Sequence, residues 1–106
     1  MMIGVDLTNI SRFENKDEKF VSKILHPQEI IEYNKAADKA LFLARYWSIK
    51  EALYKSDNKL FKFNEIYISK KDDKKYNYNN YLITTSREGD LYISFVLKEG
   101  DEKDDN

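Results

Sequence analysis

The sequence contains no cysteine, a single proline, three glycines and a single histidine in 106 residues. The absence of cysteine excludes a disulfide framework and thiolate chemistry. No apolar run approaches the roughly 20 residues of a membrane span, and the N-terminus lacks the basic and apolar segments of a signal peptide. We therefore expect a soluble, cytoplasmic protein with no membrane association.

Charge is balanced over the whole chain but unevenly distributed along it. The 18 basic and 19 acidic residues give a net charge of −1, so nothing overall directs the protein to nucleic acid. Lys16, Lys19 and Lys23 follow one another at helical spacing, with Arg12 one turn earlier. Residues 100–106 are acidic and predict a disordered tail after a single domain of residues 1–99.

The N-terminal half predicts one strand followed by helices. In "MIGVDLT" the apolar residues Ile3, Val5 and Leu7 alternate with Gly4 and Asp6, so Asp6 points away from the apolar face. Three helical patterns follow, the first over residues 11–25 and the last over residues 39–55. The second begins at "HPQEIIEY", with His26 near the cap and Pro27 at the first helical position.

The C-terminal half predicts strands. Alternation favours strands in "FNEIYIS", "YLITT" and "LYISFVL", with a polar turn region, "KKDDKKYNYNN", after the first of them. Gly89 favours a tight turn between the last two strands. One strand, a helical block and an antiparallel meander together make an α+β domain.

The longest predicted helix carries a stripe of polar residues. Ser48, Glu51 and Lys55 share one side of it, and Arg45 extends the stripe. A Glu and a Lys at i, i+4 commonly form a surface ion pair worth a few tenths of a kcal/mol. Spacing alone favours that ordinary interpretation over a functional site.

A second carboxylate, Asp6, changes the interpretation if the first strand packs beside this helix. Two hard oxygen ligands with open positions suit Mg²⁺, which also takes oxygens from water and substrate phosphates. Such a site would neutralise a diphosphate, and Lys50 and Lys55 could add positive charge. Spacing cannot establish that Asp6 and Glu51 converge, so both interpretations stay open at this point.

Two segments together resemble holo-acyl-carrier-protein synthase, the small type of 4'-phosphopantetheinyl transferase. They are "GVDLTNISRF" near the start and "FLARYWSIKEALYK" in the long helix. "KILHPQEIIEY" also looks like a helix start of that family, and the likeness extends to about Glu99. The residues that match the family pattern are Gly4, Asp6, Arg12, Phe13, Trp47, Lys50, Glu51, Ala52 and Lys55.

The resemblance implies the 4'-phosphopantetheinyl transferase fold and a Mg²⁺-dependent reaction. The phosphopantetheine arm of coenzyme A is moved to a serine of acyl carrier protein, and adenosine 3',5'-bisphosphate is released. Asp6 and Glu51 are the implied metal ligands, Glu51 and Lys55 the catalytic residues, and Lys50 and Lys55 contacts of coenzyme A. Glu51, or a water on the metal beside it, is the candidate base for the serine proton.

The resemblance also implies partners. Arg12, Lys16, Lys19 and Lys23 would meet the acidic carrier protein, mostly by electrostatic steering, although each lysine taken singly could equally belong to a solvated face. The family forms homotrimers with coenzyme A between subunits. We therefore expect the exposed faces of the terminal strands to be partly interface.

The sequence departs from the family pattern near the last strands. Ser86 matches a coenzyme-binding serine, but Arg87 stands where the family has histidine. An arginine binds phosphate through two hydrogen bonds but cannot act as a neutral base. Arg45 is one position from the family's arginine, which turns it about 100° around the helix, and His26 is expected to be structural.

Two other classes of function stay open. The chain could be a non-catalytic module that binds an acidic carrier protein, as the absence of the family histidine at Arg87 slightly favours. An RNA-binding sheet could be argued from "KKYNYNNY", where Lys and Tyr interleave as in a stacking surface. The net charge of −1 does not support the second alternative.

Overall fold

The computed structural model describes residues 2–71 and 75–100. The predicted acidic tail, apart from Gly100, lies outside the described residues. The elements along the chain are β1 (Ile3–Asn9), η1 (Ile10–Phe13), α1 (Glu18–Ile24), α2 (Pro27–Lys35), α3 (Lys39–Ser56), η2 (Phe63–Glu65), β2 (Ser69–Lys71), β3 (Lys75–Asn77), β4 (Tyr81–Glu88) and β5 (Leu91–Lys98).

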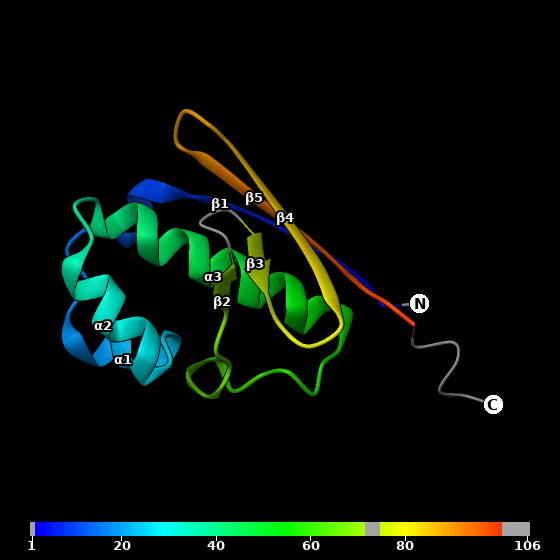
Figure 1. The fold of residues 1–106 in the computed structure, drawn as a ribbon. Helices are drawn as coiled ribbons and strands as arrows, with labels where there is room; N and C mark the ends of the chain where they lie inside the picture. Colours follow the sequence, from blue (N-terminus) through cyan, green and yellow to red (C-terminus); the bar gives the residue numbers. More distant parts are fainter. Residues whose placement is uncertain (1, 72–74, 101–106) are drawn as a thin grey trace.

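The main sheet joins the two ends of the chain. Its antiparallel order is β1-β5-β4, so the first strand pairs with the last one, while β2 and β3 form a separate pair. The helix α3 lies along one face of this sheet, and α1 and α2 gather at one end (Figure 1). The predicted α+β class is confirmed, and Gly89 has the positive φ of 58° that its turn between β4 and β5 requires.

The sheet face toward α3 is partly polar, whereas the opposite face is apolar and exposed. In β1 the buried residues are Gly4, Asp6 and Thr8, and the alternate apolar residues point outward. Seven large apolar side chains on β1, β4 and β5 are 38–59% exposed: Ile3, Val5, Leu7, Leu82, Leu91, Ile93 and Phe95. An exposed apolar face of this kind marks an interaction surface.

Gly4 allows α3 to lie unusually close to β1. A Cβ atom built at this position would be 1.9 Å from the carbonyl oxygen of Ala52. Any side chain here would therefore push the helix away from the strand. The close approach brings the C-terminal half of α3, which carries Glu51 and Lys55, against the buried face of β1.

Several boundaries differ from the sequence-based prediction. The helix predicted over residues 11–25 is a 3-10 turn followed by α1, because Asn15 has a φ of 57° and Asp17 accepts a hydrogen bond from Phe20 N to begin a new helix. "FNEIYIS" holds η2 and then buried Ile66 and Ile68, and the strand comes later at β2. Part of the predicted polar turn forms β3.

The predicted start of the second helix is confirmed. The Nδ1 atom of His26 accepts a hydrogen bond from Gln28 N at 3.0 Å, and Pro27 occupies the first helical position. Glu29 completes a capping box by accepting from the backbone N–H of His26. The single histidine therefore has the structural place expected for it.

Candidate active site

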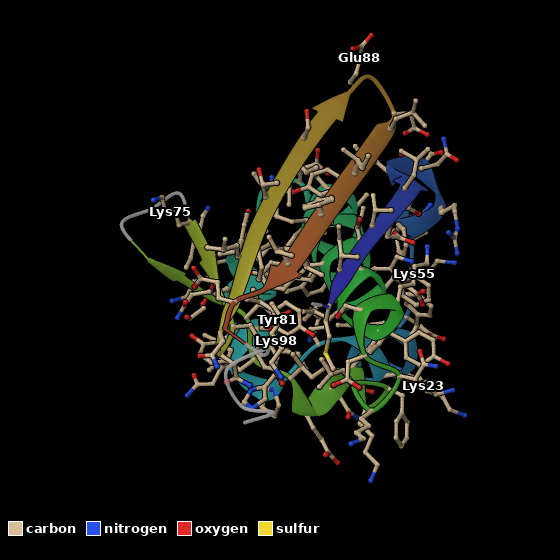
Figure 2. All side chains as sticks on the ribbon, turned by 90° about the vertical axis from the view of Figure 1, so that its right-hand side faces the viewer. Lys23, Lys55, Lys75, Tyr81, Glu88 and Lys98 are labelled. Atoms are coloured by element: carbon tan, nitrogen blue, oxygen red, sulfur yellow. The ribbon has the colours of Figure 1, made fainter. Side chains whose placement is uncertain are left out.

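The structure brings Asp6, Glu51 and Lys55 together between β1 and α3. Lys55 Nζ lies 3.1 Å from Asp6 Oδ1 and donates to the backbone oxygen of Val5 at 3.2 Å. Glu51 precedes Lys55 by one turn of α3 and is half-buried. Figure 2 shows Lys55 beside β1, at one edge of the sheet. The Glu51–Lys55 stripe is thus part of a strand–helix contact rather than a free surface.

Glu51 lies in an electrostatically unfavourable place for a lone carboxylate. Burial and then the charge of Asp6 raise the pKa of Glu51, while Lys55 and Arg12 oppose that shift. On Asp6, Oδ1 pairs with Lys55, but Oδ2 is buried and has no hydrogen-bond partner among the described residues. A cation between the two carboxylates would relieve both features.

The donor set fits Mg²⁺ better than a metal that needs a complete protein cage. The described residues contain no group of three or more His, Cys, Asp and Glu side chains arranged to hold an ion. A cation here would have the carboxylates of Asp6 and Glu51 and would take its other oxygens from water or a substrate. Mg²⁺ is commonly bound in this way, through one or two carboxylates and substrate phosphates.

Arg12 places a fixed cation close to Glu51. Its Nη1 donates to Thr8 Oγ1 at 3.0 Å, and its guanidinium carbon lies 5.2 Å and 5.6 Å from the ring centres of Phe13 and Trp47. These contacts hold the guanidinium at the end of β1. The matched arginine and tryptophan of the two motifs therefore touch each other.

The three lysines of the predicted carrier-binding face are all exposed. Lys19 and Lys23 lie on α1, and Lys16 precedes that helix with its ammonium group 5.0 Å from the ring centre of Phe20. Figure 2 shows Lys23 and Lys55 toward the same side of the molecule. Lys23 of the predicted carrier-binding face thus lies on the same side of the molecule as Lys55 of the carboxylate cluster.

Lys50, predicted to contact coenzyme A, lies in the core. Its side chain is 0% exposed, and its ammonium group donates to the backbone oxygens of Ile24 and Phe63, both at 2.8 Å, and to Glu29 Oε1 at 2.6 Å. An ammonium group has three protons, so all of its donors are used. Lys50 therefore has a structural role and is not free to contact coenzyme A, contrary to the prediction.

Glu29 is the buried partner of Lys50, a role that the sequence pattern did not predict. It is 0% exposed, and its second oxygen accepts a hydrogen bond from Ile68 N at 2.7 Å. The Glu29–Lys50 pair thus connects α2 and α3 with the chain leading into β2. In the sequence, Glu29 looks like an ordinary first-turn acid near a helix N-terminus, and no local pattern marks it as buried.

Ser86 and Arg87 lie at the opposite edge of the sheet from Asp6. They belong to β4, which β5 separates from β1. A hollow of about 350 Å³ there is lined by Leu41, Arg45, Lys70, Tyr76, Thr85, Ser86, Arg87 and Tyr92. Within one chain Ser86 and Arg87 are therefore not brought together with the carboxylate cluster, whereas Lys55, another predicted coenzyme contact, belongs to that cluster.

Arg45 points into this hollow and away from the stripe of Glu51. Its Nε donates to the hydroxyl oxygen of Tyr92 at 2.9 Å, and its guanidinium lies 6.0 Å from the ring centre of Tyr76. With Lys70 and Arg87 it gives the hollow three cationic side chains. The one-position offset noted in the sequence thus directs Arg45 toward β5.

In the described part of the chain, no helix is both long and apolar enough to cross a bilayer. The cytoplasmic location stays a prediction.

The segment proposed as an RNA-stacking surface has Tyr76, Tyr78 and Tyr81 partly or fully packed against the core. Those rings are not presented as a free stacking platform.

Comparisons with known proteins agree with the motif resemblance. The profile of the 4'-phosphopantetheinyl transferase superfamily matches residues 2–100. The holo-[acyl-carrier-protein] synthase of Mycoplasma mobile is 50% identical over 98 residues, covering 92% of this chain and 89% of that protein. The enzyme of the same name from Mycoplasmopsis pulmonis is 49% identical over 100 residues, covering 94% and 92%.

Solved structures share the fold at lower sequence identity. A holo-(acyl-carrier-protein) synthase from Bacillus anthracis, in complex with CoA (3',5'-ADP), has a TM-score of 0.80 and 22% identity, covering 94% of this chain and 96% of that one. The Helicobacter pylori protein in complex with coenzyme A has a TM-score of 0.73 and 24% identity, covering 92% and 100%. The predicted family, fold and enzyme class are confirmed, which disfavours the non-catalytic alternative. The chain belongs to the 4'-phosphopantetheinyl transferase superfamily, in the group of the holo-[acyl-carrier-protein] synthases.

Proposed function

We propose that this enzyme transfers the 4'-phosphopantetheine group of coenzyme A to a serine of acyl carrier protein in a Mg²⁺-dependent reaction. The observation that carries the proposal is the convergence of Asp6, Glu51 and Lys55, in which one carboxylate oxygen lacks a partner and the other carboxyl group has a raised pKa. The names of the relatives and the coenzyme-bound neighbours support the choice of substrates.

Asp6, Glu51 and Lys55 have separate roles in the proposed transfer. Asp6 and Glu51 would hold Mg²⁺, which when bound neutralises the diphosphate and polarises its P–O bonds. Lys55, half exposed and already aimed at Asp6, swings to the diphosphate as a second positive charge. Most of the catalysis is positioning and charge neutralisation.

The reaction forms one bond and breaks one. The serine oxygen of the carrier attacks the phosphorus that bears the pantetheine arm, and the bond from that phosphorus to the oxygen of adenosine 3',5'-bisphosphate breaks. The serine proton passes to a free carboxylate oxygen of Glu51. A carboxylate can accept the proton of a hydroxyl group that is positioned within hydrogen-bond reach, as general-base catalysis requires.

The coenzyme site would be completed by a second subunit. Ser86 and Arg87 lie at the far edge of the sheet from Asp6, and the hollow beside them is cationic. We propose that the exposed apolar sheet face packs in a homotrimer, so that the β4 edge of one chain meets the carboxylate cluster of the next. Coenzyme A would then lie between two subunits, with its phosphates near Arg87.

Replacing Val5 by aspartate should dissociate this trimer. Val5 is 47% exposed on the apolar face, where a buried, unpaired carboxylate at the interface would be costly. Sedimentation should give about three times the chain mass of 12.6 kDa for the wild type and a monomer for the variant. Ile31→Asp is the matched control, because Ile31 is similarly exposed at 54% but lies on α2. A trimeric Val5→Asp protein would contradict the assignment.

The exposed lysines near α1 would attract the acidic carrier protein. Lys19→Glu should slow association about fivefold at low salt, equivalent to about 1 kcal/mol of screened attraction, and leave kcat unchanged. Lys35→Glu changes the net charge equally but lies at the end of α2. Stopped-flow binding at several salt concentrations measures the effect. If both variants slowed association equally, the effect of Lys19→Glu would come from net charge alone. That result would contradict a docking face near α1.

A mass measurement tests the proposed reaction directly. Apo acyl carrier protein is incubated with the enzyme, coenzyme A and Mg²⁺, and its mass is then determined. The carrier should gain one phosphopantetheine group, and adenosine 3',5'-bisphosphate should appear in equal amount. No gain in mass, while a known synthase modifies the same carrier in parallel, would refute the proposal. Chelation of divalent cations should stop the gain.

A further inference from the structure

Ser94 is the residue directly opposite Asp6 in the pairing of β1 with β5. Both side chains point toward α3, and Ser94 is 0% exposed while Asp6 is 8% exposed. Side chains directly opposite each other in an antiparallel pair have Cβ atoms about 4.5–5.5 Å apart. The hydroxyl group of Ser94 therefore lies near the Asp6 carboxylate, although the two side chains make no hydrogen bond in the structure.

Each of these two residues has a buried oxygen without a partner. Among the described residues, Asp6 Oδ2 and Ser94 Oγ are the buried side-chain nitrogen or oxygen atoms that make no hydrogen bond. Leaving such a group unsatisfied costs about 1–3 kcal/mol, so native proteins retain few of them. Finding both members of one cross-strand pair in this condition indicates that they serve a common purpose.

Packing explains why residue 94 is small but not why it carries a hydroxyl group. Gly4 shows how closely α3 approaches the sheet, so a large side chain at position 94 would not fit. An alanine would fill nearly the same space without burying a hydroxyl group. Ser48, on the facing side of α3, is equally buried, but its hydroxyl group donates to the backbone oxygen of Asp6 at 3.4 Å.

We propose that Ser94 is a positioning residue of the metal site, whose hydroxyl group donates a hydrogen bond to Asp6 Oδ2 and holds that carboxylate in the orientation that binds Mg²⁺. A serine hydroxyl rotates to suit its acceptor, whereas Asp6 Oδ1, which Lys55 contacts in the structure, becomes available to the metal when Lys55 moves to the diphosphate. The inference rests on the proposed function, since it assigns a role toward the metal that Asp6 and Glu51 would hold. Hydrogen bonds to metal-ligating carboxylates typically change metal affinity by 10–100-fold.

Metal binding can be measured without turnover by using Mn²⁺ as the probe. With saturating coenzyme A and no carrier protein, the paramagnetic resonance signal of free Mn²⁺ falls as the ion binds. Ser94→Ala should raise the Kd for Mn²⁺ about tenfold, whereas its metal-free Tm should be unchanged or higher because an unsatisfied hydroxyl group is removed. Ser94→Cys keeps a weak donor of similar size. Its Kd for Mn²⁺ should therefore lie between the values of the wild type and of Ser94→Ala.

Two further variants separate this inference from the metal site itself. Ser48→Ala also deletes a buried hydroxyl group between α3 and the sheet. Its Kd should stay within about twofold of the wild type, since the Ser48 hydroxyl group donates to the backbone oxygen of Asp6 and not to its carboxylate. Glu51→Gln should abolish binding. A wild-type Kd in Ser94→Ala, together with loss in Glu51→Gln, would overturn the role of Ser94 alone. Undiminished binding in Glu51→Gln would overturn the metal site and this inference with it.

Discussion

Replacing Lys50 by methionine should lower the free energy of unfolding by about 3–5 kcal/mol, because Glu29 would be left as an unpaired charge in the core. Both side chains are 0% exposed and lie 2.6 Å apart. Methionine has a similar shape, so the loss is electrostatic rather than a large cavity. Urea unfolding at pH 7 and one fixed protein concentration measures it, since a trimer's stability would depend on concentration.

The shifts within the pair indicate why removing one partner is so costly. Burial raises the pKa of Glu29 and lowers that of Lys50, against the attraction between the two charges. Burial thus disfavours the charged form of both groups, and their attraction and hydrogen bonds oppose that effect. A single substitution keeps one desolvation cost and removes the attraction that offset it.

The same helix supplies a matched control for Lys50→Met. Lys55→Met makes an identical chemical change five residues later, at a side chain that is 49% exposed, and should lower stability by no more than about 1 kcal/mol, because water can take the place of a half-exposed ammonium group beside Asp6. In a double-mutant cycle, Glu29→Gln with Lys50→Met should cost less than the sum of the single changes by about 1–3 kcal/mol. Equal losses in Lys50→Met and Lys55→Met would contradict a buried pair.

Replacing Glu51 by glutamine should reduce transfer by at least about 100-fold. Partners in the second shell of a metal site alone change affinity or activity by 10–100-fold, and the loss of a direct ligand should exceed that. The amide keeps the size of the side chain and removes its charge. Turnover of coenzyme A onto apo carrier protein, at saturating Mg²⁺, measures the loss.

The stability of Glu51→Gln distinguishes lost chemistry from lost structure. In the folded state, burial and then the charge of Asp6 raise the pKa of Glu51 above 4.5, the ordinary value for a glutamate. A carboxyl group with a raised folded pKa favours folding while protonated, and that contribution is lost as the pH rises through the folded pKa. In metal-free buffer the variant should therefore have a higher Tm than the wild type at pH 7, and an equal Tm below pH 4.5.

Divalent cations should reverse that order. With coenzyme A present throughout, adding Mg²⁺ should raise the Tm of the wild type and leave that of Glu51→Gln unchanged, because a ligand stabilises the state that binds it. A variant that is less stable than the wild type at pH 7 in chelator would point to a structural role for the carboxylate. Undiminished transfer by Glu51→Gln would remove Glu51 from both its metal-binding and its catalytic roles.

The sequence by itself determined the elements whose signals are local. Alternation placed β1, β4 and β5, the His26-Pro27 start placed α2, and a run free of glycine and proline placed α3. Helix caps and strand alternation depend on residues a few positions apart, so their signals are present in the sequence. The two motifs at their spacing also determined the family.

Tertiary structure alone decided the roles of adjacent charged residues. Lys50 and Glu51 are neighbours in the sequence, yet one is buried against Glu29 and the other faces Asp6. Successive helix residues point about 100° apart, and both directions carry charged side chains here. Which direction becomes core depends on where α2 and β1 pack against α3, and no local pattern within α3 specifies that packing.

The partnership of Asp6 and Ser94 also came only from the fold. It depends on the register between the first and the last strand, and a shift of one residue would turn every side chain of β1 to the other face. That register is fixed by long-range packing, including the close contact of Gly4 with α3. Local alternation states that Asp6 and the apolar residues lie on opposite faces, but only the covering helix decides that the polar face is the buried one.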